Sequence, residues 1–177
     1  MNYPDSVRFL YSLGNENKTI KFGLERIRTV LDALGSPHKL GKFVHVAGTN
    51  GKESTCAMIE AALRAHGRLT GLYTSPHLIS PTECIRIGGE AIGEDRFTQA
   101  FDTVHETAER LLEQGAIDYH PTYFETVTAM AFLIFAEARV EMAVVEVGLG
   151  GRLDATNVVE PELAVITPVE FDHERLL

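Results

Sequence analysis

Four short apolar runs along the chain predict β-strands. They cover residues 43–47, 69–73, 141–147 and 163–167, and the third run is particularly rich in valine. Each run is brief and is followed by glycine, threonine or other turn-forming residues, which is typical of strands buried in a sheet.

Helical patterns lie between these runs. Residues 94–113 predict a surface helix with its apolar side chains on one face and its acidic residues on the other. Residues 127–137 are apolar nearly all round and predict a buried helix, which a capping box of Thr122 and Glu125 begins. Strands that alternate with helices indicate an α/β fold, with a mostly parallel sheet and helices on both faces.

A further helix is expected directly after residue 52, and it carries two apolar stripes. A helix with two such stripes is expected to be covered on more than one side. The first stripe contains Cys56, Ile59 and Leu63, and the second contains Met58, Ala62 and Ala65.

Composition narrows the class of protein. A length of 177 residues with 45% hydrophobic residues suits one domain and excludes wholesale disorder. A net charge of −9 disfavours a nucleic-acid partner. The longest apolar run is too short to span a bilayer, and the first residues lack the pattern of a secretory signal, so no membrane association is expected. Cys56 and Cys84 are expected to be free thiols in a reducing cytoplasm.

A glycine-rich loop with a lysine follows the first predicted strand and precedes a helix. Ligands bind beyond the carboxyl ends of strands in parallel sheets, so this loop is a candidate phosphate site. Its glycines let backbone N–H groups approach a phosphate, and Lys52 adds a cation. The strict P-loop pattern is absent, because Val46 and Glu53 replace two of its residues, and a plain strand-to-helix turn is the alternative. The candidate residues are Gly48, Thr49, Asn50, Gly51, Lys52, Glu53 and Ser54.

Polar residues also follow the other predicted strands. Glu146 ends the third apolar run, and a carboxylate in a central strand is costly unless it is paired, so Mg²⁺ is a candidate partner. An edge strand with Glu146 in solvent is the alternative. Ser75 and His173 are weaker signals by themselves, because Ser-Pro often marks a turn and imidazole is an unusual Mg²⁺ ligand. Together these groups are the set that holds a nucleotide polyphosphate with Mg²⁺.

Several segments, in order, resemble those of one enzyme family. The most selective is residues 146–157, Glu-Val-Gly-Leu-Gly-Gly-Arg-Leu-Asp-Ala-Thr-Asn, and residues 45–52, His-Val-Ala-Gly-Thr-Asn-Gly-Lys, add the nucleotide loop. With these segments the chain resembles the folylpolyglutamate synthases of the Mur ligase superfamily. Further matching segments are residues 73–78, 122–125, 166–167 and 172–173.

The resemblance implies a P-loop-containing, Mur-ligase-like ATP-binding domain and an ATP-dependent acid–amino-acid ligase. In that reaction ATP phosphorylates the carboxylate of folate or dihydropteroate, and the amine of L-glutamate then displaces phosphate. ATP and Mg²⁺ are the implied cofactors, with the glycine-rich loop on the phosphates and Lys52 neutralising charge. The implied Mg²⁺ positions are Ser75, Glu146 and His173, and the implied catalytic residues are Lys52, Glu146 and His173.

The resemblance gives less definite indications for the folate. His77 and Arg86 lie in the family's substrate-side segment, and an arginine suits a carboxylate-rich substrate. Arg152 and Asp154 are further candidates. Their alternative role is to stabilise the loop that follows the third predicted strand.

The chain departs from the family in two residues and in length. Glu53 stands where glycine is usual, and Cys84 stands where arginine is usual. Family members are considerably longer, so residues 1–177 are expected to be a truncated N-terminal ATP-binding domain that lacks the C-terminal glutamate-binding domain and has little activity alone. A stand-alone nucleotide-binding module is the alternative. A dinucleotide oxidoreductase is disfavoured, because residues 148–151 do not fit its glycine pattern.

Overall fold

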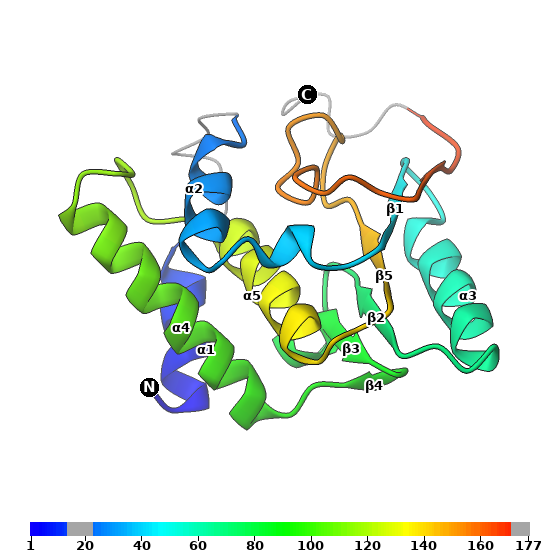
Figure 1. The fold of residues 1–177 in the computed structure, drawn as a ribbon, viewed down its shortest axis with the longest axis horizontal. Helices are drawn as coiled ribbons and strands as arrows, with labels where there is room; N and C mark the ends of the chain where they lie inside the picture. The colour runs from blue at the N-terminus through cyan, green and yellow to red at the C-terminus, as the bar shows by residue number, and fades with distance from the viewer. Residues whose placement is uncertain (14–22, 171–177) are drawn as a thin grey trace.

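A sheet flanked by helices forms the centre of the protein (Figure 1). The computed structural model describes residues 1–13 and 23–170. The sheet has six strands: β1 (Phe43–Ala47), β2 (Thr70–Tyr73), β3 (Ile85–Ile87), β4 (Glu90–Ala91), β5 (Met142–Glu146) and β6 (Leu163–Ile166).

The strands follow the order β4-β3-β2-β5-β1-β6 across the sheet. β2, β5, β1 and β6 run parallel to one another, which confirms a mostly parallel sheet. These four are the strands that the apolar runs predict, and their observed ends differ from the predicted ones by about one residue. β5 and β1 are interior strands of the sheet, so the carboxyl end of each is flanked on both sides.

An antiparallel hairpin that the sequence did not predict extends the sheet beyond β2. β3 pairs antiparallel with β2, and β4 pairs antiparallel with β3. Gly88 and Gly89 form the turn between β3 and β4, and both have positive φ angles, of 59° and 87°. Glycine adopts such angles without steric cost, which explains the pair at this turn.

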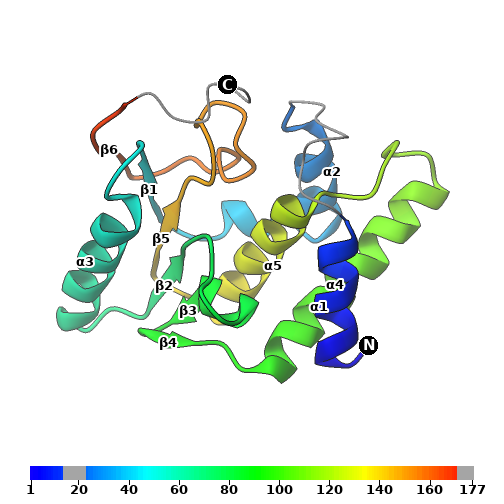
Figure 2. The same cartoon turned by 180° about the vertical axis from the view of Figure 1, so that it is seen from behind.

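Helices cover both faces of the sheet, as predicted. α3 lies on one face, and α5 lies on the other face with α1, α2 and α4 packed outside it (Figures 1 and 2). The α-helices are α1 (Tyr3–Ser12), α2 (Glu25–Ala33), α3 (Lys52–Ala65), α4 (Glu94–Glu113) and α5 (Tyr123–Glu137). Two 3-10 turns, Pro37–Lys39 and Pro81–Cys84, complete the described elements.

The helix α5 is the buried helix that the sequence predicts. Every side chain from Glu125 to Phe135 is buried, and most of them belong to the main apolar core. The predicted capping box is present, because the Thr122 and Glu125 side chains each accept a hydrogen bond from the other residue's backbone N–H. The Arg26 guanidinium lies 2.7 Å from the Glu125 carboxylate and compensates its buried charge.

The expectation that α3 is covered on more than one side is wrong. Cys56 and Glu60 are its buried residues, Ile59 and Leu63 pack partly against the sheet, and Met58 of the second stripe is 65% exposed. The helix forms the outer layer on its face of the sheet, so only one stripe has a surface to pack against. None of the helices in the described ranges is long and apolar enough to cross a membrane. Both cysteines are free, as expected, and both are buried.

Candidate functional site

Three of the predicted site segments meet at one edge of the sheet. The glycine-rich loop follows β1, Glu146 is the last residue of β5, and Ser75 comes shortly after β2. Because β2, β5 and β1 are adjacent and parallel, their carboxyl ends lie side by side. Val46 is the register partner of Glu146, which places the carboxylate level with the start of the loop.

The loop after β1 ends in a helix whose N-terminus is open. Gly51 is the N-cap of α3 and adopts a left-handed conformation with φ of 80°, and no side chain accepts a hydrogen bond there. The first backbone N–H groups of a helix have no partner within the helix, and they carry its positive dipole end. This end of α3 is therefore suited to an anion such as phosphate.

A segment far along the chain holds the loop in shape. The Thr49 backbone N–H donates to the Pro168 carbonyl at 3.0 Å, and the Glu170 N–H donates to the Thr49 hydroxyl at 3.1 Å. Gly48 has φ of 132°, and a Cβ at this position would clash with Oγ1 of Thr167. Gly48 is thus required both by its backbone angle and by the close approach of this segment.

Lys52 folds back over the loop. Its Nζ donates to the Thr49 carbonyl oxygen at 3.2 Å, and its side chain is half-buried. Asn50, Glu53 and Ser54 are exposed at the same end of α3. The negative charge of Glu53 therefore faces solvent beside the loop and does not occupy it.

Glu146 is buried within reach of both Ser75 and Lys52. Its side chain is 3% exposed, and its Oε2 accepts a hydrogen bond from the Ser75 backbone N–H at 3.1 Å. Burial raises the pKa of Glu146 to about 7, although the Ser75 hydrogen bond and the Lys52 charge act to lower it. Since β5 lies between β2 and β1, the alternative of an exposed edge strand is excluded.

Asp154 organises the loop after β5. Its carboxylate accepts hydrogen bonds from the Leu149 N–H at 2.8 Å and from the Thr156 N–H at 2.9 Å, and the Thr156 hydroxyl also donates to it. Burial raises the pKa of Asp154. These contacts fit the alternative role, in which Asp154 stabilises the loop. Arg152 is exposed in the same loop, and its carbonyl accepts from the Asn157 amide at 3.0 Å.

His45 completes this network, although sequence reasoning gave it no role. Its Nε2 lies 2.7 Å from the Thr156 hydroxyl, which links β1 to the loop after β5. Burial lowers the pKa of His45, so the ring is neutral at neutral pH. A histidine inside an apolar strand, which requires a polar partner when buried, was the available signal.

Of the predicted substrate-side residues, His77 contacts α1. The Tyr11 hydroxyl is 2.9 Å from His77 Nε2, and the Tyr11 ring stacks on Tyr123 with centroids 5.8 Å apart. The other ring nitrogen of His77 is 3.9 Å from the sulfur of Cys84, and Arg86 follows on β3. Sequence reasoning missed Tyr11, because nothing in the spacing of α1 links it to a segment 66 residues away.

A cavity of about 290 Å³ lies at the opposite ends of the strands. Phe43 and Ala143, near the amino ends of β1 and β5, line it together with Pro37, Phe135 and Arg139. It therefore does not include the glycine-rich loop or Glu146. His173 lies outside the described residues.

Comparisons with known proteins agree on one family. The Mur ligase middle domain model matches residues 46–174. The folylpolyglutamate synthase of Lacticaseibacillus casei is 41% identical over the whole chain, which spans 41% of that relative's length. The dihydrofolate synthase/folylpolyglutamate synthase of Escherichia coli is 41% identical over 89% of the chain and 35% of its own length. A solved FPGS–AMPPCP–folate complex superposes with a TM-score of 0.93 at 41% identity, over 100% of this chain and 42% of that one.

Proposed function

Because the chain belongs to the Mur ligase middle-domain family, we propose that it forms the ATP- and Mg²⁺-binding part of a ligase that joins L-glutamate to folate or dihydropteroate. The relatives named above carry folylpolyglutamate synthase and dihydrofolate synthase activities in their names, and one relative is solved with an ATP analogue and folate. The chain spans less than half the length of those relatives. The complete reaction is therefore proposed for the whole ligase, and nucleotide and Mg²⁺ binding are proposed for this chain.

One observation carries the proposal. The open N-terminus of α3, Lys52 and the buried Glu146 lie together at the carboxyl edge of the sheet. A phosphate site beside an oxygen-rich metal site is the arrangement that phosphoryl transfer requires.

The residues present fit Mg²⁺ bound with a nucleotide. Glu146 offers a buried carboxylate that accepts one described hydrogen bond, from Ser75, and so keeps oxygen lone pairs for a cation. Ser75 adds a hydroxyl, and Mg²⁺ prefers such oxygen ligands. Bound Mg²⁺ would neutralise the charge of the phosphate oxygens. We assign Ser75 and Glu146 to the metal, and His173, outside the described residues, as the third position.

The loop residues bind and orient the nucleotide in this proposal. The backbone N–H groups of residues 50–54 face the phosphates, whereas the Thr49 N–H donates to the Pro168 carbonyl. The close packing of Thr167 on Gly48 keeps the loop in one shape. Lys52 exchanges its contact with the Thr49 carbonyl for the outer phosphates. Its ammonium then stabilises the charge that develops as the phosphoryl group moves to the carboxylate of the folate substrate.

The substrate side is assigned to the neighbouring loop after β2. His77 and Arg86 are its candidate contacts to the carboxylate-rich folate, and Tyr11 holds His77 in place through the 2.9 Å hydrogen bond. Arg152 is exposed and remains a candidate contact, whereas Asp154 is assigned to the loop itself. The cytoplasmic location expected from the free thiols stays a prediction.

A nucleotide-binding experiment tests the proposal directly. A fluorescent ATP analogue is titrated into the 177-residue chain with and without Mg²⁺. We expect Lys52→Ala to weaken binding by about tenfold or more, which corresponds to one lost charge-assisted contact. Lys42→Ala is the matched control, since Lys42 is an exposed lysine 3.8 Å from Glu162.

Equal binding by the Lys52→Ala and Lys42→Ala variants would contradict the assigned phosphate site. A second assay measures ADP release that depends on both folate and glutamate, in this chain and in a full-length relative. Little release by the chain and full release by the relative is the expected outcome. Equal release by the chain and by the relative would instead show that the part of the ligase outside this chain is dispensable.

A further inference from the structure

Two histidines and a glutamate gather on the side of the molecule formed by α1 and α4. His105 and Glu109 lie one turn apart on α4, and His120 lies in the segment that leads into α5. Sequence reasoning assigned no role to either histidine, because the two are 15 residues apart and belong to different elements. The fold brings their ring nitrogens to 3.3 Å from each other.

The three atoms that face one another form a nearly regular triangle. His105 Nδ1 is 3.9 Å from Glu109 Oε1, and His120 Nε2 is 3.8 Å from the same oxygen. With the 3.3 Å distance between the nitrogens as its third side, this triangle has a circumradius of about 2.1 Å, close to the roughly 2.0–2.2 Å that Zn²⁺ keeps from nitrogen and oxygen ligands. One ion at the centre of the triangle therefore reaches all three atoms without rearrangement of the backbone.

The His120 ring is already oriented to act as a ligand. Its Nδ1 lies 3.0 Å from the Pro121 carbonyl oxygen, which can only accept, so Nδ1 carries the hydrogen. In the neutral ring the lone pair is then on Nε2, the atom that faces His105 and Glu109. A backbone carbonyl in this position is the usual way in which proteins fix the tautomer of a metal-binding histidine.

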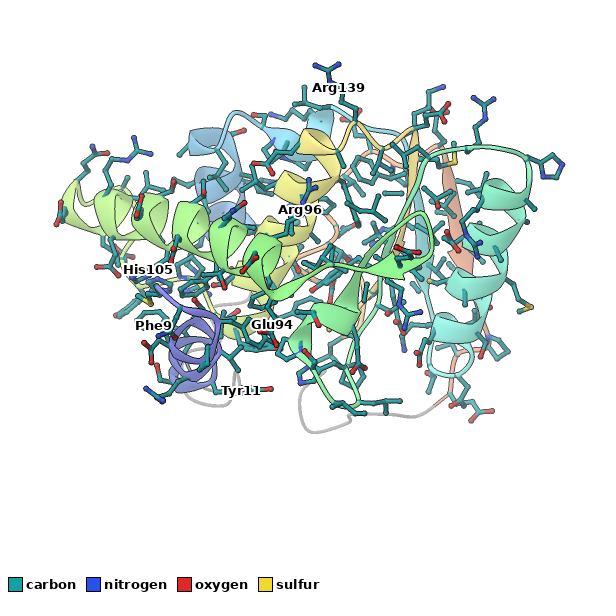
Figure 3. All side chains as sticks on the ribbon, turned by 90° about the horizontal axis from the view of Figure 1, so that it is seen from below. Phe9, Tyr11, Glu94, Arg96, His105 and Arg139 are labelled. Carbon is teal, nitrogen blue, oxygen red and sulfur yellow. The ribbon has the colours of Figure 1, made fainter. Side chains whose placement is uncertain are left out.

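Aromatic rings pack against the two imidazoles. Phe9 of α1 packs at 4.5 Å from His105 and 5.5 Å from His120, measured between ring centroids. Phe101 stacks on His105 at 5.5 Å with an angle of 9° between the rings. Figure 3 shows Phe9 beside His105 where α1 crosses α4. Both histidine side chains are about 15% exposed or less, whereas Glu109 is 51% exposed and leaves a route from solvent.

We propose that His105, Glu109 and His120 bind one divalent transition-metal ion of the borderline class, with Zn²⁺ as its representative. Two imidazole nitrogens and one carboxylate oxygen are a set that such ions favour, whereas Mg²⁺ prefers oxygen alone. The three side chains leave a coordination position for water on the exposed side. The site is built on α4 and the lead-in to α5, and is independent of the proposed nucleotide site.

Metal binding moves one proton within the His105 ring and leaves the number of protons bound by the protein unchanged. Without the ion, His105 Nδ1 donates its hydrogen to His120 Nε2. Coordination needs the lone pair of His105 Nδ1, so that proton leaves to solvent and another is taken up at Nε2 of the same ring. The ion thereby joins α4 to the segment before α5, and Phe9 extends this connection to α1.

Metal titration of the 177-residue chain tests the proposal. The chain is stripped with a chelator and titrated with Zn²⁺ against a chromogenic competitor, in excess Mg²⁺ to fill oxygen-rich sites. We expect one Zn²⁺ per chain, with affinity about tenfold or more weaker in His120→Ala and Glu109→Gln. His66→Ala is the control, since His66 is an exposed histidine at the end of α3.

Two further measurements keep the outcome clear if a variant folds poorly. Glu109→Gln changes a half-exposed side chain, and circular dichroism establishes its fold before titration. Zn²⁺ is expected to raise the melting temperature of the unmodified chain and of His66→Ala, and to raise that of Glu109→Gln by less at the same Zn²⁺ concentration. Zn²⁺ binding that is equal in the unmodified chain and in Glu109→Gln, or that is lost in His66→Ala, would overturn the proposal.

Discussion

The buried carboxylate of Glu146 has an energetic consequence that a single substitution measures. Its pKa is about 7 in the fold against an ordinary value of 4.5, because burial disfavours the charged form. At about pH 8 the fold must hold this group ionised, which costs roughly 3 kcal/mol relative to the unfolded chain. Glu146→Gln removes that cost while the side-chain oxygen still accepts from the Ser75 N–H. We therefore expect the variant to be more stable at this pH.

The difference in stability between Glu146→Gln and the unmodified chain is expected to shrink as the pH falls. As the pH falls below about 7, the folded Glu146 takes up a proton that the unfolded chain does not bind until about 4.5. The unmodified chain thereby gains stability, so the advantage of Glu146→Gln shrinks and is mostly gone near pH 5. An advantage of about 3 kcal/mol corresponds to a rise of roughly 6–12 °C in melting temperature for a chain of this size.

Thermal melting with and without nucleotide separates stability from function. A saturating Mg²⁺–nucleotide complex at about 100 times its Kd adds roughly 2.7 kcal/mol to the unmodified chain. We expect Glu146→Gln to gain little, because it lacks the anionic oxygen proposed to hold Mg²⁺. Glu90→Gln, a change of an exposed carboxylate on β4, serves as the control. A variant that melts lower than the unmodified chain at pH 8, or that gains equally from Mg²⁺–nucleotide, would refute this reasoning.

Three other predictions follow from described contacts. Gly48→Ala is expected to destabilise the fold by about 1–3 kcal/mol and to weaken nucleotide binding. The reason is the φ of 132° at residue 48 and the close approach of Thr167. An unchanged melting temperature would contradict this prediction. Burial raises the pKa of Cys56 and of Cys84 to about 12, so neither thiol should react with a thiol reagent at pH 8 until the chain unfolds, and rapid labelling in native buffer would show the opposite. Arg26→Met removes the guanidinium that lies 2.7 Å from the buried Glu125 carboxylate. We expect the free energy of unfolding, measured by denaturant titration, to fall by about 3 kcal/mol. A fall below about 1 kcal/mol would show that the ion pair contributes little.

The sequence predicted the parts of this fold that rest on strong local signals. The strand β1, the glycine-rich loop and α3 follow one another as expected, and the capping box marks the start of α5 correctly. The proximity of Glu146 to Ser75 was also predictable, because adjacent parallel strands place their carboxyl ends together.

The parts that were missed depend on contacts between distant segments. β3 and β4 have three and two residues, too few for an alternating pattern to be recognised. The second apolar stripe of α3 was misinterpreted, because a sequence does not show how many layers cover a helix. His105 and Glu109 are spaced one helical turn apart, yet their partner His120 comes from another element, so the cluster emerges only in the folded chain.

The hydrogen bonds between Thr49 and Glu170 also have a consequence for folding during synthesis. The two residues are 121 positions apart, so the loop after β1 leaves the ribosome long before the segment that shapes it. At synthesis rates of about 5–20 residues per second, that interval is of the order of ten seconds. During this time β1 lacks its partner strands β5 and β6, and the loop lacks the contacts of Pro168 and Glu170. Nucleotide binding is therefore expected only after nearly all of the described chain has been made.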